Sequence, residues 1–289
     1  AYMRGEPMEA RRLAGGLCGG ETPLQLRTGG WLLYGCAAMW TGDIAAWEQA
    51  VRELTALAAP PDMQREKELA AAILIAALHG QKYPEWLEMG DFTGLSPELF
   101  PAARWIYGAI LYIKWKGIDR LALAGLLVSE CRRDRSDICE IYLRLIAATA
   151  YHDHGYTEQA KKHIDEAAAL ALPLGFIAPF VEYRRMLLSV MDERIQGKYP
   201  ETLSLIKKKM PPFLESWTRV YNGVWQHKIA EGLTPKEFEV CMLAARGMQR
   251  KEIAGRLGIS LNSVGKYLSE AYGKLDVEKK EQLKRLIHP

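Results

Sequence analysis

The sequence predicts an all-α protein on the strength of three observations. Apolar residues recur in helix-length patterns, and the alternation typical of a half-buried strand is almost absent before Leu233. Near the C-terminus, short helices with clear start and stop signals follow one another. Five glycines also recur 37 or 38 residues apart, at Gly5, Gly42, Gly80, Gly117 and Gly155. The expected architecture is an array of helical hairpins followed by a small helical domain.

A constant period of this size indicates stacked helical hairpins, because one hairpin cannot bury its apolar face without neighbours. We expect most of the five glycines at the turn between paired helices; a coincidence of spacing is the alternative. The region resembles the tetratricopeptide repeat, most closely within residues 141–172. The matching positions there are Ala147, Ala150, Gly155, Tyr156, Ala160 and Ala167. Residues 1–210 are therefore predicted to be a tetratricopeptide-like superhelix used for sensing or interaction.

Residues 211–232 are predicted to connect two domains. Pro211 and Pro212 follow a helical pair that ends near Met210, and proline inside a helix removes a hydrogen bond and clashes with the preceding turn. Phe213 to Ala230 then has the pattern of one connecting helix. The domain boundary is expected between Met210 and Leu233.

Three short helices are predicted after this boundary. Thr234 and Glu237 form a capping box around a proline at the first helical position, and Gly247 supplies the positive φ that ends the first helix. A second helix spans about Arg250 to Leu257 and stops at a glycine. Ser260 caps the third.

The third helix has two distinct faces. Val264, Leu268, Ala271 and Leu275 recur at helical spacing and are expected to be buried. Small, polar and basic residues then face outward, namely Asn262, Gly265, Lys266, Ser269 and Gly273. Two helices joined by a tight turn, the second with such a face, are typical of a helix that enters the DNA major groove. A small bundle that packs only for stability is the alternative.

A fourth helix is predicted from Glu278 to Ile287. Its apolar residues Leu283, Leu286 and Ile287 are expected either to close the core of the domain or to pair two copies of it.

Residues 233–289 resemble the four-helix LuxR-type helix-turn-helix domain. The resemblance rests on Leu233-Thr234-Pro235, Glu237, Glu239-Val240, Gly247, Lys251-Glu252-Ile253-Ala254, Leu257-Gly258-Ile259-Ser260, Val264, Tyr272 and Lys274-Leu275. Gln249, Gly265 and Tyr267 depart from the family pattern, which puts base contacts in question rather than the fold. The resemblance implies binding to double-stranded DNA, with a homodimer on DNA and RNA polymerase as further partners. The candidate DNA-binding residues are Arg250, Lys251, Asn262, Ser263, Gly265, Lys266, Ser269 and Lys274.

The distribution of charge agrees with this interpretation. The chain has a net charge of +3, and residues 233–289 contain eleven lysines and arginines against seven acidic residues. The excess of positive charge therefore lies in the segment expected to contact phosphates.

The sequence shows no signal for a membrane or a disulfide framework. Its longest apolar run, Leu69 to Leu78, is too short to span a bilayer, and five cysteines without a C-x-x-C pair favour reduced, buried residues. A cytoplasmic protein without a membrane partner is expected.

The array followed by a LuxR-type domain resembles the C-terminal part of MalT-type regulators. Those regulators carry an N-terminal ATPase, and neither a P-loop motif nor an initial methionine is present here, which favours a truncated chain.

An aromatic face is the candidate ligand surface. In a helix predicted from Ala103 to Trp115, helical spacing puts Trp105, Tyr112 and Trp115 on one side, where they bind a ligand or fill the core between helices. His152-Asp153-His154 is interpreted as a solvated turn, not as a metal site.

The sequence contains no catalytic motif that we recognise, so neither an enzyme nor a cofactor is predicted. The predicted function is a DNA-binding transcriptional regulator whose repeats sense a small-molecule or protein effector. Two alternatives stay open at this point. One is a repeat scaffold for protein partners with a degenerate helix-turn-helix domain, and the other is a sigma-factor-like protein.

Overall fold

The structure is a computed structural model that describes residues 1–80, 82–114, 125, 127–129, 136–225, 233–245, 247–275 and 277–287. Within these ranges every regular element is a helix and no strand occurs, which confirms the predicted all-α class. None of the described helices combines the length and apolar character needed to cross a bilayer.

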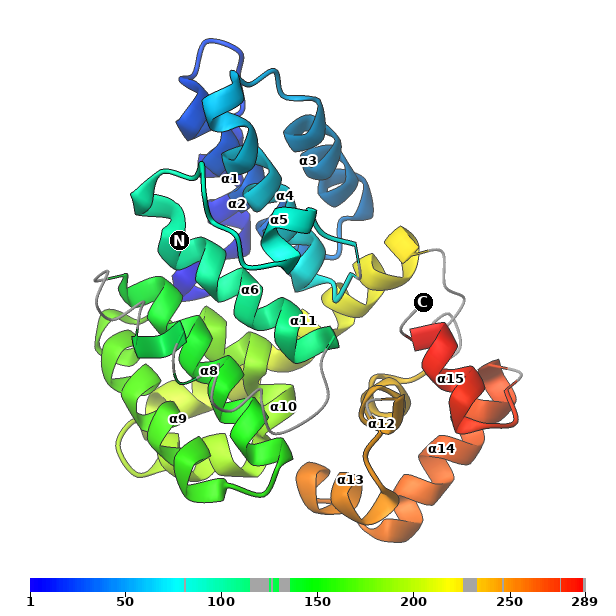
Figure 1. The fold of residues 1–289 in the computed structure, drawn as a ribbon. Helices are drawn as coiled ribbons and strands as arrows, with labels where there is room; N and C mark the ends of the chain where they lie inside the picture. The colour runs from blue at the N-terminus through cyan, green and yellow to red at the C-terminus, as the bar shows by residue number, and fades with distance from the viewer. Residues whose placement is uncertain are drawn as a thin grey trace.

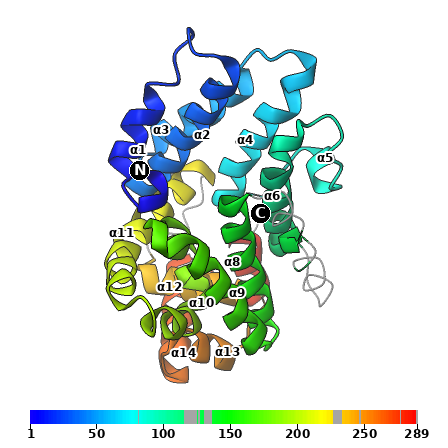
Figure 2. The same ribbon diagram turned by 90° about the vertical axis from the view of Figure 1, so that its left-hand side faces the viewer.

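The helices form an N-terminal array and a smaller C-terminal group. The array contains η1 Tyr2–Arg4, α1 Pro7–Gly15, α2 Leu24–Thr41, α3 Ile44–Ala56, η2 Pro61–Met63, α4 Gln64–Ala77, α5 Glu85–Glu88, η3 Pro97–Leu99, α6 Phe100–Lys114, α8 Asp137–Asp153, α9 Thr157–Ala171, η4 Leu172–Leu174, α10 Ala178–Gln196 and α11 Pro200–Trp225. The C-terminal group contains α12 Pro235–Ala245, α13 Arg250–Leu257, α14 Leu261–Leu275 and α15 Lys280–Ile287. Figures 1 and 2 show the array in blue to yellow and the C-terminal group in orange to red.

Two of the periodic glycines lie at the turn between paired helices, as predicted. Gly42 joins α2 to α3 with φ 71°, and Gly155 joins α8 to α9 with φ 82°. Glycine adopts this left-handed conformation without steric cost. Asp43 then caps α3 by accepting a hydrogen bond from the Ala46 N–H at 3.0 Å.

Two other glycines of the series, Gly80 and Gly5, do not lie at such a turn, and the prediction is wrong at Gly5. After α4 it is His79, not Gly80, that has the positive φ, at 54°, and the chain continues into a loop and the short α5 instead of a long paired helix. Gly5 ends η1, so it does not join two α-helices either. Gly117 lies outside the described residues. A tetratricopeptide-like repeat therefore stays a prediction for this array.

One apolar core runs through most of the molecule. Trp40 and Trp47 are buried in the array, and their cluster continues through Trp217 to Phe238 and Leu243 of α12. The aromatic rings of Trp217 and Phe238 lie 6.0 Å apart between centroids. The C-terminal group is therefore packed against the array through buried side chains.

The predicted chain break at Pro211 and Pro212 is wrong, because α11 continues through both prolines. Each proline removes one helical hydrogen bond, and the carbonyl groups that lose a donor belong to Lys207 and Lys208. All four of these residues are exposed, so water can satisfy those carbonyl groups. On its other side α11 carries buried residues, among them Phe213, Trp217 and Tyr221, and this side packs against the array.

The described part of the predicted linker therefore belongs to the array. Trp217 in α11 is 2% exposed and donates a hydrogen bond from its indole N–H to the Ala77 carbonyl at 2.8 Å. α11 contacts α2, α3 and α10 as well as α12. Lys209, also in α11, donates a hydrogen bond from its ammonium to the Gly5 carbonyl at 2.7 Å.

Candidate nucleic-acid interface

The start of the C-terminal domain is fixed by the predicted capping box. The Thr234 N–H donates to the Glu237 carboxylate at 2.6 Å, and the Glu237 N–H donates to the Thr234 hydroxyl at 3.3 Å. These two bonds satisfy backbone donors that the first turn of α12 leaves unpaired. Gly247 follows α12 with φ 99°, as the sequence predicts.

The tight turn between α13 and α14 is formed by two local signals. Gly258 ends α13 with φ 61°, and the Ser260 hydroxyl accepts a hydrogen bond from the Ser263 N–H at 3.0 Å. Gln249, which departs from the family pattern, precedes α13, and its N–H donates to the Glu252 carboxylate at 2.5 Å. Gln249 and Glu252 therefore form a capping box at the start of this helix.

α14 has the two faces that its sequence predicts. Val264, Leu268 and Ala271 are buried against the rest of the domain, whereas Leu275, also expected to be buried, is only partly buried. The opposite face carries the exposed Asn262, Lys266 and Ser269, with Gly265 and Ser263 partly exposed. In Figure 1, α14 lies at the outer edge of the domain, on the side away from α8 and α10. A polar face of this kind is accessible to a large, rigid partner such as duplex DNA.

The surroundings of Gly265 are open. A methyl group built on its Cα would have no heavy atom within 4 Å, apart from its own neighbours and the helix backbone. Nothing described inside the domain therefore requires glycine there. Lys266 beside it is 73% exposed and lies 3.7 Å from the Glu270 carboxylate, a distance too long for a strong ion pair.

The other basic candidates differ in their surroundings. Arg250 and Lys251 are exposed at the start of α13. Lys274 instead reaches both carboxylate oxygens of Glu237 at 2.8 Å, so it ties the end of α14 to the start of α12. Burial by itself would raise the pKa of Glu237, but the Lys274 ammonium and the Thr234 N–H hold that pKa below its ordinary value. In this conformation the Lys274 ammonium is therefore occupied inside the domain.

α15 closes the core of the domain. Leu283 is completely buried, and α15 packs on α12. Leu283 therefore serves the first of the two predicted roles, which is to close the core of the domain. The side chains of Leu286 and Ile287 lie outside those that the structure describes.

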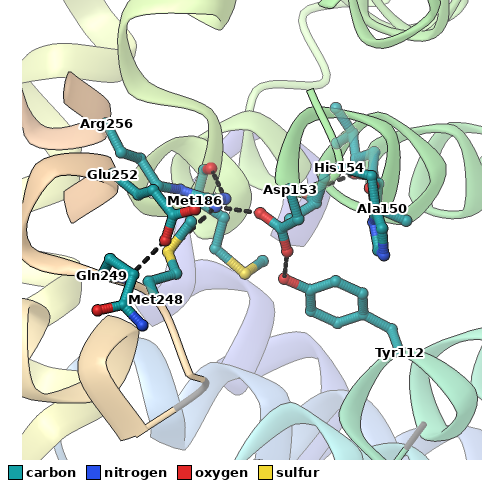
Figure 3. A network of polar contacts seen from close by, with 11 residues as sticks. Tyr112, Ala150, Asp153, His154, Met186, Met248, Gln249, Glu252 and Arg256 are labelled. Atoms are coloured by element: carbon teal, nitrogen blue, oxygen red, sulfur yellow. Dashed lines mark hydrogen bonds and ion pairs between the residues drawn. The ribbon is translucent and has the colours of Figure 1, made fainter. Parts of the chain in front are cut away.

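An ion pair not predicted from the sequence joins the domain to the array (Figure 3). The Arg256 side chain, from α13, is 2% exposed and donates to the Asp153 carboxylate at the end of α8 and to the Met186 carbonyl in α10. Asp153 also accepts a hydrogen bond from the Tyr112 hydroxyl at 2.9 Å. The interpretation of residues 152–154 as a solvated turn is therefore wrong at Asp153, because a segment distant in sequence covers it.

The predicted aromatic face is divided between two places. Trp105 lines a cavity within the array and stacks on Tyr142 with 4.4 Å between ring centroids. Tyr112, on the same α6, belongs to the polar contact with Asp153 and Arg256 (Figure 3). Trp115 lies outside the described residues.

The geometry of α12 to α15 defines a class of domain, the helix-turn-helix domain with a fourth supporting helix. Residues 231–287 match the family model described as "Bacterial regulatory proteins, luxR family". This match identifies the C-terminal segment as a LuxR-type domain. Comparisons with curated proteins and with solved structures gave no match.

Proposed function

We propose that this protein is a transcriptional regulator that binds duplex DNA through α14 and receives an effector through its N-terminal array. The observation that carries the proposal is the exposed polar face of α14, opposite its buried stripe, within a segment that matches the luxR family. Lys266 and Ser269 are proposed to meet base edges or nearby phosphates, and Asn262 and Ser263 the backbone. Arg250 and Lys251 add positive charge at the start of α13.

The proposed effector role of the array is supported by a cavity that lies within the array. The cavity that Trp105 lines has a volume of about 240 Å³ and lies between helices of the array. The buried residues of α14, in contrast, pack in the core of a small domain. Pairing of two domains on DNA and contact with RNA polymerase stay predictions drawn from the family resemblance.

Binding of fluorescent duplexes by the full chain, measured by anisotropy across a salt titration, tests DNA binding. Affinity should fall steeply as salt rises, because phosphate contacts release counterions. Lys266→Ala should weaken binding by about 1 kcal/mol, roughly fivefold, and reduce the salt slope by about 1. Lys162→Ala is the matched control, because it removes the same charge from an exposed position on α9.

The two variants separate a specific surface from a general charge effect. Equal losses for Lys266→Ala and Lys162→Ala would contradict the placement of α14 in the groove. A parent chain that binds no genomic duplex at any salt concentration would favour the repeat scaffold with a degenerate helix-turn-helix domain. Stable association with the RNA polymerase core in place of duplex binding would favour the sigma-factor-like alternative.

A further inference from the structure

We propose that the cavity inside the array is a binding site for a small apolar amine, with Glu182 as the residue that receives its ammonium group. The proposal gives the chemical class of the effector, and in this respect it rests on the proposed function. Binding of the amine itself does not depend on DNA binding. The cavity is lined by side chains of η1, α2, α4, α6, α8, α10 and α11. It therefore lies where most of the array converges.

The walls of the cavity are predominantly apolar. α2 contributes Leu32 and Met39, α4 contributes Ile73, and α6 contributes Ile106 and Ala109. Two further lining residues, Leu33 and Ile138, are also apolar and are exposed at 42% and 43%. A volume of about 240 Å³ bounded by such side chains fits a small hydrophobic body.

Glu182 supplies the polar group of this cavity. Its carboxylate accepts hydrogen bonds from the Tyr2 hydroxyl at 2.6 Å, the Trp40 indole N–H at 2.9 Å and the Tyr142 hydroxyl at 3.0 Å. All three donors are neutral. Burial raises the pKa of Glu182, and the three hydrogen bonds together with the charge of Arg185 oppose that rise only in part. A carboxylate held this way in apolar surroundings is best complemented by a cation.

The aromatic rings beside Glu182 also favour a cation. Tyr142, which donates to Glu182, stacks on Trp105, and both residues line the cavity. The electron-rich faces of such rings attract ammonium groups. Arg185, the other charged residue of the lining, lies over the Trp217 ring at 4.1 Å and 2.9 Å from the His79 ring nitrogen. Its guanidinium is thereby engaged with the wall formed by α11 and the residue after α4.

The part of the cavity lining that α10 contributes also faces the C-terminal domain. Arg185 and Met186 line the cavity and also a smaller pocket bounded by Phe238 and Met242 of α12. The Met186 carbonyl accepts the hydrogen bond from Arg256 (Figure 3). An occupant of the cavity would therefore touch residues that hold the DNA-binding domain in place.

Calorimetric titration of the full chain with octylamine, 1-octanol and octanoate tests this site, because the three probes share one chain and differ in the head group. Octylamine should bind at one site, at least about tenfold tighter than the other two. Glu182→Gln should remove most of that preference, since it retains the size of the side chain and deletes its charge. Preference of the parent for octanoate, or equal binding of all three probes, would overturn the proposal.

Two further variants locate the site. Ala109→Phe should fill the cavity and abolish octylamine binding, whereas Ala45→Phe, at an exposed position of α3, should bind like the parent. If Ala109→Phe does not fold, Ile138→Arg replaces it, because Ile138 is exposed and a cation there should weaken octylamine binding at least about tenfold. Parent-like octylamine binding by the variant tested would contradict the assignment.

Anisotropy with duplex DNA, measured on the same parent protein without amine, separates the two proposals. Salt-dependent DNA binding without octylamine binding would remove only the amine site. Octylamine binding without DNA binding would remove only the regulator.

Discussion

The C-terminal domain and the N-terminal array are both helical, but the ends of their helices have different causes. In the C-terminal domain, Thr234 and Ser260 begin helices and Gly247 and Gly258 end them, each through contacts within a few residues. In the array, α11 continues through two prolines, and the positive φ that follows α4 belongs to His79 and not to a glycine. Local signals therefore set the helix ends of the C-terminal domain. In the array they also act, as at Gly42 and Asp43, but packing between distant segments overrides them at α11.

Among the substitutions that test this comparison, the largest effect on the free energy of unfolding is expected at Trp217. Its indole is buried in the array, donates to Ala77 from a distant part of the chain and stacks on Tyr221. Trp217→Ala should lower the free energy of unfolding by about 3–5 kcal/mol, through lost burial and the cavity that remains. Urea unfolding followed by circular dichroism measures this change.

Two controls accompany that measurement. Trp217→Phe retains an aromatic ring and should cost less than Trp217→Ala, while Arg219→Ala, at an exposed position on the same helix, should stay within about 0.5 kcal/mol of the parent. If Trp217→Ala also stays within that range, α11 is not held by long-range packing and the contrast between the regions fails.

An intermediate effect is expected at Arg256, where the two regions meet. Arg256→Met retains much of the apolar stem but leaves Asp153 without its cation, and it should cost about 1–3 kcal/mol of unfolding free energy. Hydrogen exchange should increase in α13 and in the part of α10 around Met186. Arg250→Met, an exposed arginine in the same helix, is the matched control.

A double variant sharpens this test. Asp153→Asn combined with Arg256→Met should cost less than the sum of the two single changes, because each single change leaves an unpaired partner behind. Strictly additive costs would mean that the two side chains do not interact in solution.

The smallest effect is expected at Gly265, where local helix propensity decides. Gly265→Ala should raise the free energy of unfolding by about 0.5–1 kcal/mol, because a Cβ there enters open space. We also expect weaker specific DNA binding, since the methyl group would add bulk to the outer face of α14. Gly265→Lys should instead strengthen binding to all duplexes and steepen the salt dependence.

Gly255→Ala on the exposed side of α13 provides the comparison for Gly265→Ala, because its Cβ also meets no heavy atom within 4 Å. It should stabilise the domain similarly without changing DNA affinity. Parent-like DNA binding by both Gly265 variants would show that this position does not face DNA.

These differences explain how much the sequence could predict. The bounds of α12, α13 and α14, their caps and the two faces of α14 follow from short-range patterns, and the structure agrees with them. Pro211 misled the prediction because its exposure depends on which side of α11 packs against the array. The partner of Asp153 lies 103 residues further along the chain at Arg256, and no periodicity in the sequence relates the two positions. The role of Glu182 was not predicted either, because its hydrogen-bond donors Tyr2, Trp40 and Tyr142 are also distant in sequence.

The continuity of α11 also has a mechanical consequence. At roughly 1.5 Å per residue, its 26 residues form a rod about 39 Å long, with Trp217 against the cavity and Trp225 at its far end. Two consecutive residues without backbone donors, Pro211 and Pro212, make this rod easier to bend at their position than elsewhere. A tilt of α11 about these prolines would displace Trp225 more than Trp217, because Trp225 lies farther from them along the helix.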